Sequence, residues 1–301
     1  MANKDKNKPV AEAAVIDAQP VEASTAVAVV EQGETGLMTA DQQAAMIAQM
    51  MADDAGVGFE NVTAADVAIP YLKLLQKGSP QCEEGNQAFM DAAKAGMLLN
   101  NVTNGLVDIR TTAQKFAVVV PVSYIKVISV WRPNQGGKVC DLPMNQATLD
   151  AATRKDTPDG GIILVNEEGN ILEETAKFNV LLLTADGGVH WGIMALSGSK
   201  LGAAKKWMSL VTSKKMPNST KQAPIFSFMY KVASYLETSK RTGKTYQQLR
   251  FEDFGKITDP TMYVAAKEYR QAVLTGTVKE AVNDVAPDAS ADTGTGDDVP
   301  F

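Results

Sequence analysis

The apolar run Val189-His190-Trp191-Gly192-Ile193-Met194-Ala195-Leu196 opens the stretch on which the fold depends, residues 189–250. A second apolar run, residues 178–184, precedes it. The residues between the two runs, Asp186-Gly187-Gly188, are of the types that adopt the positive φ angles of a tight hairpin turn. The sequence therefore predicts an antiparallel hairpin built from residues 178–184 and 189–196.

A second strand pair is predicted further along the same stretch. Residues 225–238 alternate, and one face carries the apolar set Phe226, Phe228, Tyr230, Val232 and Leu236. A basic turn at 240–244 leads into a returning strand, residues 245–251. If the apolar faces of both strands share the core, the opposite, open face of the sheet carries Lys231, Tyr235, Tyr246 and Arg250.

Two helices are predicted around these strands. Residues 200–213 place Leu201, Ala204, Met208 and Val211 on one face, with Ser199 as the expected N-cap. Asp259-Pro260 starts a final helix that runs towards Leu274, because an N-cap followed by proline at the first helical position is a typical helix start.

The rest of the middle is predicted to be mostly β. Residues 116–131 form a long strand that Pro121 should bend with a bulge, since proline lacks a ladder donor. Residues 161–166 and 171–174 are expected to pair as a hairpin. Residues 69–75 read as an edge strand, and residues 86–95 as a short helix. The predicted fold class is mainly β with helices (α+β).

Composition divides the chain into four parts. Residues 1–36 are expected to be a disordered arm and residues 37–60 an amphipathic helix with a linker. Residues 61–281 form the folded body, and residues 282–301 a disordered acidic tail. The helix would begin with a capping box of Thr39 and Gln42 and carry a Met-rich apolar stripe. This stripe either docks on the body or another subunit, or the helix is solvated.

Charge is segregated along the chain. Residues 1–60 carry three lysines and ten acids, a balance of −7, and residues 281–301 carry five aspartates and no cation. With a whole-chain charge of −6, the middle is therefore basic at +6. No acid occurs between Asp186 and Glu237, although seven lysines do. Lysines interleaved with aromatic rings are what single-stranded nucleic-acid binding needs, although a solvated surface also tolerates them.

Several kinds of chemistry are not indicated. Cys82 and Cys140 are widely spaced, which suggests neither a disulfide framework nor a zinc site. The single histidine, His190, leaves no second candidate for a His-dependent triad. Thr242-Gly243-Lys244-Thr245 resembles the end of a phosphate-binding loop, but Thr238 stands where that loop needs glycine. We expect no enzyme and no cofactor. We also expect no signal peptide and no membrane span, which would place the protein in a cytoplasmic compartment.

The candidate DNA-binding residues are cations and rings of the basic middle. The cations could contact phosphates and the rings could stack on bases, although Trp207 could instead belong to the core. The full set is Lys126, Trp131, Arg132, Lys138, Lys200, Lys205, Lys206, Trp207, Lys214, Lys215, Lys221, Lys231, Tyr235, Lys240, Arg241, Lys244, Tyr246 and Arg250.

Two parts of the sequence carry a resemblance to known proteins. The ending Asp297-Asp298-Val299-Pro300-Phe301 resembles the tip of bacterial single-stranded DNA-binding proteins, which end in Asp-Ile-Pro-Phe. The body resembles phage-encoded single-stranded DNA-binding proteins in four pieces: Ile69-Pro70 to Leu75-Gln76, Val119 through Trp131-Arg132-Pro133 to Gly136-Gly137, Leu196-Ser197-Gly198 through Lys206-Trp207, and Pro224-Ile225-Phe226 through Tyr230-Lys231.

The resemblance implies an OB-type β-barrel elaborated by helices. Such a protein would coat single strands in the host-cell cytoplasm during phage replication and recombination. The tail, Asp297 to Phe301, would recruit a polymerase, a helicase or primase, or a nuclease. A homo-oligomer remains open. The alternatives are a recombination protein that anneals strands and a virion or scaffold protein; a nuclease comes third, because no carboxylate cluster is evident.

Overall fold

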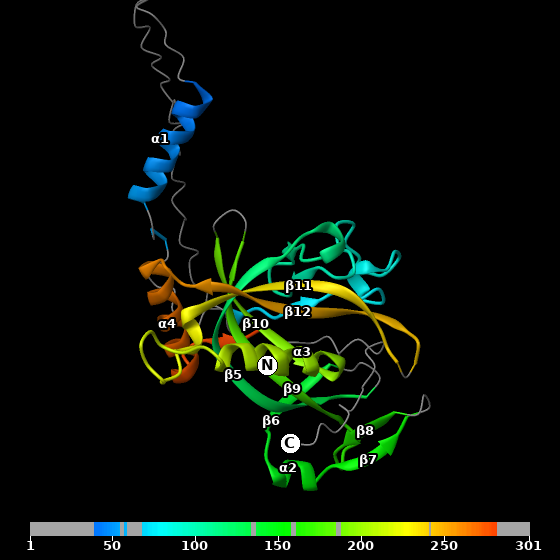
Figure 1. Cartoon of the computed structure of the whole chain (residues 1–301). Coiled ribbons are helices and arrows are strands. Elements are labelled where there is room, and N and C mark those ends of the chain that lie inside the picture. The colour runs from blue at the N-terminus through cyan, green and yellow to red at the C-terminus, as the bar shows by residue number, and fades with distance from the viewer. Residues whose placement is uncertain are drawn as a thin grey trace, which may run out of the picture. The chain divides into compact units, whose positions relative to one another are not determined.

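The structure is a computed structural model that describes residues 39–54, 57–58, 68–133, 137–157, 161–184, 188–240 and 242–281 (Figure 1). The chain divides into two units, residues 1–60 and residues 61–301. The predicted arm, residues 1–36, and the predicted tail, residues 282–301, lie outside the described residues, as does Arg241.

Most of the described part of the first unit is helix α1 (Ala40–Asp53). Its predicted capping box is confirmed: the backbone N–H of Gln42 donates to Thr39 Oγ1 (3.3 Å), and that of Thr39 donates to Gln42 Oε1 (2.9 Å). These bonds satisfy two of the donors that a helix start leaves without partners. The Met-rich stripe, Met46, Ile47, Met50 and Met51, is exposed.

The second unit is built around two long antiparallel strands, β5 (Ala117–Trp131) and β9 (Ile171–Leu183). Beside the start of β5 lies β11 (Phe228–Thr238), followed by β12 (Thr245–Lys256), and beside its end lies β6 (Lys138–Pro143). Strand β10 (Val189–Ser197) pairs with most of β9. Strands β8 (Ile162–Val165) and β7 (Thr153–Asp156) continue the sheet from the start of β9. The two predicted hairpins, β9–β10 and β8–β9, are confirmed.

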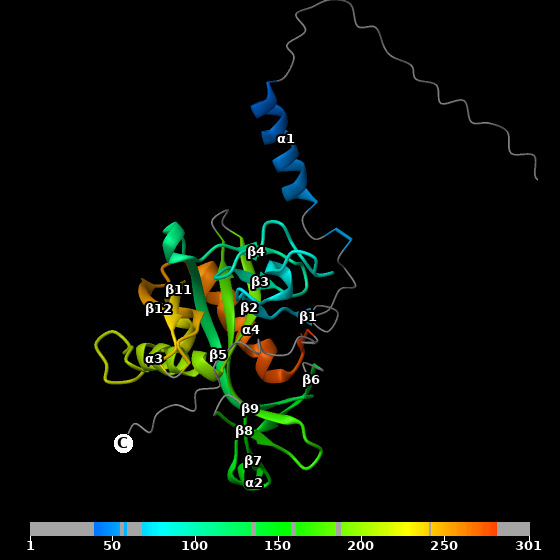
Figure 2. The ribbon, with the colours of Figure 1, turned by 90° about the vertical axis from the view of Figure 1, so that its right-hand side faces the viewer.

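Pro121 has the predicted effect on β5. The register of β5 against β9 shifts between Pro121 and Ser123, so the bulge occurs where the proline removes a ladder donor. Strand β5 bends along its length (Figure 2). The first half of β5 therefore pairs with β11, which in turn pairs with β12, whereas the second half of β5 pairs with β6.

The prediction of a mainly β protein with helices is confirmed, but the expected barrel is not closed. Strands β12 and β7 lie at opposite ends of the strand order, and no pairing among the described residues joins them. Side chains cover part of the outer edge of β12 instead. The Gln76 side chain donates to the carbonyl oxygen of Gln247 (3.0 Å) and accepts from its backbone N–H (2.8 Å).

The chain between residues 68 and 107 forms two smaller sheets. The predicted single strand at 69–75 is divided into β1 (Ala68–Ile69), which pairs with β13 (Lys279–Glu280), and β2 (Leu72–Leu74). Strand β2 pairs with β3 (Leu98–Asn100), which pairs with β4 (Leu106–Val107). The predicted helix at 86–95 is wrong: these residues form turns, and a short 3₁₀ turn, η1 (Pro80–Cys82), precedes them.

Two helices cover opposite faces of the large sheet (Figure 2). Helix α3 (Leu201–Thr212) packs with Val119 and Phe178 in one core, whereas α4 (Pro260–Thr275) packs with Val120 and Leu181 in the other. Neighbouring residues of one strand thus serve opposite cores. Both helices were predicted, but α3 starts at Leu201 with Lys200 at its N-cap position, rather than at Lys200 with Ser199 as N-cap, because residues Gly198–Lys200 form a 3₁₀ turn, η3.

The remaining short elements lie at the margins of the sheet. Helix α2 (Gln146–Asp150) covers a small apolar cluster with β6 and β8. The 3₁₀ turn η2 (Thr111–Ala113) lies beside β11, and η4 (Ile225–Ser227) leads into it. Because of η4, Phe226 does not share the β11 face with Phe228; it packs in the α4 core instead.

Candidate functional site

The antiparallel ribbon β11–β12 presents the predicted open face. Opposite residues of an antiparallel pair point to the same side of the sheet. The register places Lys231 opposite Glu252, Ala233 opposite Arg250, Tyr235 opposite Gln248 and Glu237 opposite Tyr246. These residues, together with Phe254, define what we call the open face. Its expected members Lys231, Tyr235, Tyr246 and Arg250 do lie on one side.

The opposite face of the ribbon is buried because it belongs to the α3 core. Val232, Leu249 and Phe251 point there, and Trp207 stacks on Phe251. Gln248 is buried although its register places it on the open side. Its side chain donates to the carbonyl oxygen of Ser199 (2.9 Å) and accepts from the backbone N–H of Leu249 (3.0 Å), along the strand's edge.

At one end of the open face, two aromatic rings flank a lysine. The ammonium nitrogen of Lys231 lies 4.7 Å from the ring centroid of Phe116 and 5.4 Å from that of Phe254. The two ring centroids are 6.4 Å apart, and the rings are 48 % and 45 % exposed. No ion pair of Lys231 is found in the described part of the chain. The site therefore offers two half-exposed rings around a cation whose charge no carboxylate offsets directly.

A pocket of about 260 Å³ adjoins Phe116 and Lys231. Lys115, Lys231 and Arg250 line it together with one carboxylate, Glu252, which pairs with Arg250 at 3.0 Å. The remaining lining residues are Thr111, Gln114, Phe116 and Ala233. Three cations against one carboxylate favour an anionic ligand, and guanidinium and ammonium groups are the usual partners of phosphate.

The open face continues from this pocket towards the β11–β12 turn. Tyr235 and Tyr246 are partly buried, and the Tyr235 hydroxyl lies 3.5 Å from Glu237. Burial and the neighbouring Glu237 carboxylate raise the pKa of Tyr235, so the ring stays neutral. Beyond them, Lys240 and Lys244 are exposed at the turn. Rings and cations thus follow one side of the ribbon.

Sequence reasoning missed three residues of the open face and its adjoining pocket: Lys115, Phe116 and Phe254. Phe116 was predicted only as the first residue of a long strand and directly precedes β5, and β12 extends beyond the predicted end at residue 251 to Lys256. A signal for Phe254 was available. If the predicted strand is extended beyond residue 251 with the same alternation, Phe254 falls on the same side as Arg250 and Glu252.

Other predicted cations lie elsewhere on the body. Lys205 and Lys206 are exposed on α3, and Lys215 and Lys221 are exposed after it. Helix α3 packs against the buried face of the ribbon, so these two α3 lysines are separated from the open face. Lys214 is paired with Asp253 (2.5 Å) and lies 5.1 Å from the Phe228 ring centroid.

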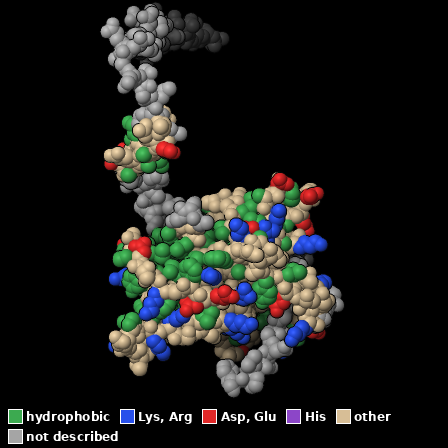
Figure 3. All heavy atoms as spheres, turned by 45° about the horizontal axis from the view of Figure 1, so that its top comes forward, with side chains coloured by type: hydrophobic (Ala, Val, Ile, Leu, Met, Phe, Trp, Pro, Cys, Tyr) green, Lys and Arg blue, Asp and Glu red, His purple; other side chains and the backbone are tan. Residues whose placement is uncertain are grey.

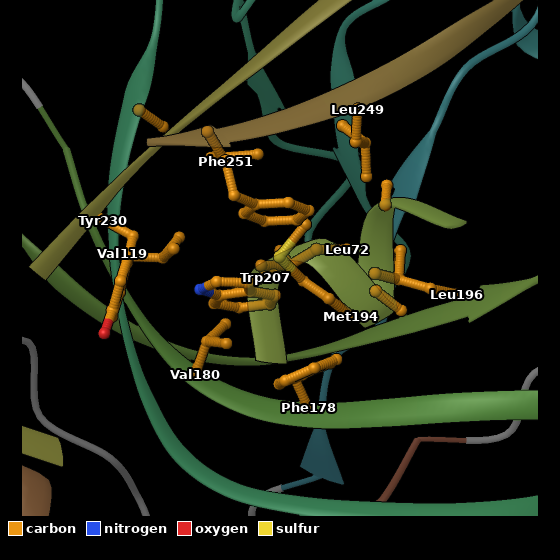
Figure 4. Packing of buried hydrophobic residues seen from close by; sticks show 14 of the residues in the cluster. Leu72, Val119, Phe178, Val180, Met194, Leu196, Trp207, Tyr230, Leu249 and Phe251 are labelled. Carbon is orange, nitrogen blue, oxygen red and sulfur yellow. The ribbon is translucent and has the colours of Figure 1, made fainter. Parts of the chain in front are cut away.

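The two tryptophans predicted to stack on bases are corrected by the structure. Trp207 is 0 % exposed and is stacked between Phe178 (centroids 4.2 Å apart) and Phe251 (4.1 Å). Figure 4 shows it among Val180, Met194 and Leu72. Trp207 lies three residues from Ala204 and four from Val211, which puts it on the helix's inward face. Trp131 is 7 % exposed. Neither ring presents a face to solvent.

Of the other predicted cations, two are already engaged. Lys126 pairs with Glu174, and Lys138 pairs with Asp141 (2.7 Å). Arg132 is exposed at the end of β5, and Lys200 lies in η3. Figure 3 shows that blue and red side chains are interspersed on the face it presents. The predicted basic residues therefore do not form one continuous surface.

The described residues contain neither a group of potential metal ligands nor a membrane-spanning helix. Among them, no three His, Cys, Asp or Glu side chains are grouped so that they could hold a metal ion. Within the same ranges, the helices are too short or too polar to span a bilayer.

The comparisons with known proteins gave one finding. The model of a family described as Pam3 phage gp34-like protein matches residues 38–279. No curated protein and no solved structure matches the chain. The family match covers α1 and nearly the whole body.

Proposed function

The chain belongs to the Pam3 phage gp34-like protein family, and we propose that it binds single-stranded DNA without sequence preference. The observation that carries the proposal is the open face of the β11–β12 ribbon. There the half-exposed rings of Phe116 and Phe254 flank Lys231, and Lys115 and Arg250 line the adjoining pocket.

The chemistry of this face suits a single strand better than a duplex. A base in a single strand exposes its π-face and can stack on a ring, whereas bases in a duplex are stacked on one another. Stacking tolerates any base, and cations contact phosphates regardless of sequence. A surface of rings and cations without an ordered set of hydrogen-bonding groups should therefore bind with little sequence preference.

We also propose that the body is a variant of the OB fold. In its favour are an antiparallel sheet whose long strand β5 is bent at a bulge, and an exposed sheet face. OB folds bind oligonucleotides on such a face. The unclosed edge at β12 would be a departure from the barrel.

The acidic tail, Asp297 to Phe301, is proposed to have two roles. Its carboxylates would compete with phosphates for the cations when DNA is absent. When DNA displaces the tail, Phe301 would bind a replication or recombination protein of the host cytoplasm, a polymerase, a helicase or primase, or a nuclease. The protein itself would act without catalysis and without a cofactor.

Fluorescence anisotropy of a labelled oligothymidine across a salt series tests the proposal. Each phosphate neutralised on a single strand contributes about −0.7 to the slope of log K against log salt. The triple variant Lys115→Ala, Lys231→Ala and Arg250→Ala should flatten the slope by roughly 2. The matched control, Lys205→Ala, Lys206→Ala and Lys221→Ala, removes the same charge from three exposed lysines that do not line the pocket and should leave the slope nearly unchanged.

Duplex of equal length added as competitor should displace little of the labelled strand. Absence of binding at low salt, also after removal of residues 292–301, would refute the function. Equal loss in both triple variants would instead place binding outside the open face.

One observation favours a different class, a structural assembly protein. The apolar stripe of α1 is exposed, and three of its members are methionines, which adapt readily to a partner surface. An assembly protein would form large oligomers whose size depends on Met46, Ile47, Met50 and Met51, and it would lack salt-dependent DNA binding. Light scattering alongside the anisotropy series separates the two readings.

A further inference from the structure

The pocket beside the open face lies between the β11–β12 ribbon and the loop of residues 111–116. This loop is fastened at its start, where Thr111 Oγ1 donates to the carbonyl oxygen of Ser234 on β11 (2.9 Å). Further along the loop, the backbone N–H of Lys115 donates to the carbonyl oxygen of Arg110 (3.0 Å), and the next residue but one begins β5. The loop is therefore held at both ends, and its residues form one wall of the pocket.

One residue of this wall, Gln114, has a backbone conformation that its residue type rarely adopts. Its φ and ψ angles are 55° and 31°, in the left-handed region. Among the described residues, the other non-glycine positions with positive φ are Asn104 and Asn218, and asparagine tolerates this region better than glutamine does. Such strain persists only where the surrounding structure imposes it, and it is frequent at ligand sites. The strained turn places Gln114 and Lys115 beside the ribbon.

The lining of the pocket carries an excess of two positive charges. Its cations are Lys115, Lys231 and Arg250, and its one carboxylate is Glu252. Glu252 contacts the Nε of Arg250 (3.0 Å), and the terminal nitrogens of this guanidinium have no hydrogen bond to any described residue. Those nitrogens can therefore bind a ligand while Glu252 keeps its contact.

A second carboxylate, Asp108, acts on Lys115 from outside the lining. Arg110, and to a lesser extent Lys115, lower the pKa of Asp108. The two carboxylate oxygens of Asp108 both accept from the Arg110 guanidinium (2.8 and 2.7 Å). Because this pair is neutral as a unit, it leaves the positive excess of the pocket unchanged.

A phosphate monoester matches this excess better than a phosphodiester does. A monoester carries roughly −1.5 to −2 charge at neutral pH and three terminal oxygens, whereas each phosphodiester within a strand carries one negative charge. Each of the three cations could contact one oxygen of the monoester. A cavity of about 150 Å³ holds one benzene molecule, so about 260 Å³ leaves room for a base beside the phosphate, next to the half-exposed ring of Phe116.

We propose that this pocket binds a phosphate monoester, either the terminal phosphate of a DNA strand or a free nucleotide. The strand form rests on the proposed DNA-binding function and adds to it a preference for phosphorylated ends. The free form does not depend on that function.

Oligothymidines that differ only at their ends test the strand form by anisotropy, with the label at the opposite end. A strand phosphorylated at its 5′ or its 3′ end should bind about tenfold more tightly than the unphosphorylated strand, as one charge-assisted hydrogen bond provides. An unphosphorylated strand one nucleotide longer controls for charge alone and should show no such gain.

Calorimetry with thymidine monophosphate and thymidine tests the free form. The monophosphate should bind about tenfold more tightly than the nucleoside, for the same reason. A gain with the phosphorylated strand assigns the pocket to strand ends, and a gain with the monophosphate alone assigns it to free nucleotides. If neither phosphate improves binding, the proposal is overturned, even where unphosphorylated oligothymidine binds and the DNA-binding function stands.

Variants of two exposed lysines locate the effect. Lys115→Gln should remove the advantage of the phosphorylated ligand over its unphosphorylated counterpart, because it takes one cation from the pocket. The matched control is Lys205→Gln on α3, which removes the same charge outside the pocket and should keep the advantage. Both positions are exposed, so both variants should fold. An advantage that survives in Lys115→Gln, or that disappears equally in both variants, would refute the assignment to this pocket.

Discussion

Replacing Phe254 by alanine separates a DNA-binding role of the open face from a structural one. A ring that stacks on a base contributes roughly 1–3 kcal/mol to binding. At about 1.4 kcal/mol per factor of ten, Phe254→Ala should weaken the oligothymidine complex by about 5- to 150-fold. The cost to folding should be small. Full burial of a phenylalanine contributes roughly 1.5–3 kcal/mol, and this ring is 45 % exposed, so about 1 kcal/mol should be lost.

The assay is anisotropy at fixed salt, paired with urea unfolding of the same preparation. The matched control is Phe89→Ala, which removes a phenylalanine that is 37 % exposed and lies outside the open face. Because Phe254 carries no charge, its loss should leave the salt slope intact, whereas Lys231→Ala should reduce the slope by roughly 0.7. Equal losses in Phe254→Ala and Phe89→Ala, or unchanged affinity in Phe254→Ala, would contradict stacking at this site.

Three predictions concern the body. Trp207→Ala should lower the free energy of unfolding by roughly 3–5 kcal/mol, measured in urea, because it empties the centre of a stacked aromatic core. Gly192→Ala should cost roughly 1–3 kcal/mol, since the new Cβ would stand 2.7 Å from Leu72 Cδ1; Gly202→Ala, whose Cβ meets nothing within 4 Å, is the control and should not destabilise. Burial opposes ionisation of Asp141, but the two lysine ammonium groups that contact it outweigh burial and lower its pKa. The stability that this carboxylate supplies is therefore present at neutral pH and lost as pH falls through its folded-state pKa, so Asp141→Asn should flatten the acid limb of a plot of stability against pH.

The strands and helices that could be predicted are those whose signals are local. The alternation of residues 228–236 and the turn residues near 240–244 lie within one ribbon, and its register follows once the apolar faces are assigned. Pro121 acts on its own strand, and Asp259-Pro260 acts on its own helix. In each case the deciding atoms are within a few residues of one another.

The failures depend on partners that are distant in sequence. The edge of β12 is capped at Gln247 by a side chain 171 residues away, and no local pattern predicts an open sheet rather than a barrel. From the sequence alone, Trp207 could be an exposed ring. Only the folded chain brings Phe178 and Phe251 against its two faces. Likewise, Phe116 and Phe254 form a pair across 138 residues, which only the β5–β11–β12 order brings together.

The pairing of β1 with β13 has a consequence for protein engineering. Ala68 pairs with Lys279, and the backbone N–H of Ala281 donates to the carbonyl oxygen of Ile69 (2.9 Å). The chain therefore enters and leaves the body on neighbouring strands, about 5 Å apart. A short linker could join these ends in a circular permutant, with new termini at an exposed turn such as Gly243. The same closeness would allow the body to be inserted whole into a surface loop of a reporter protein.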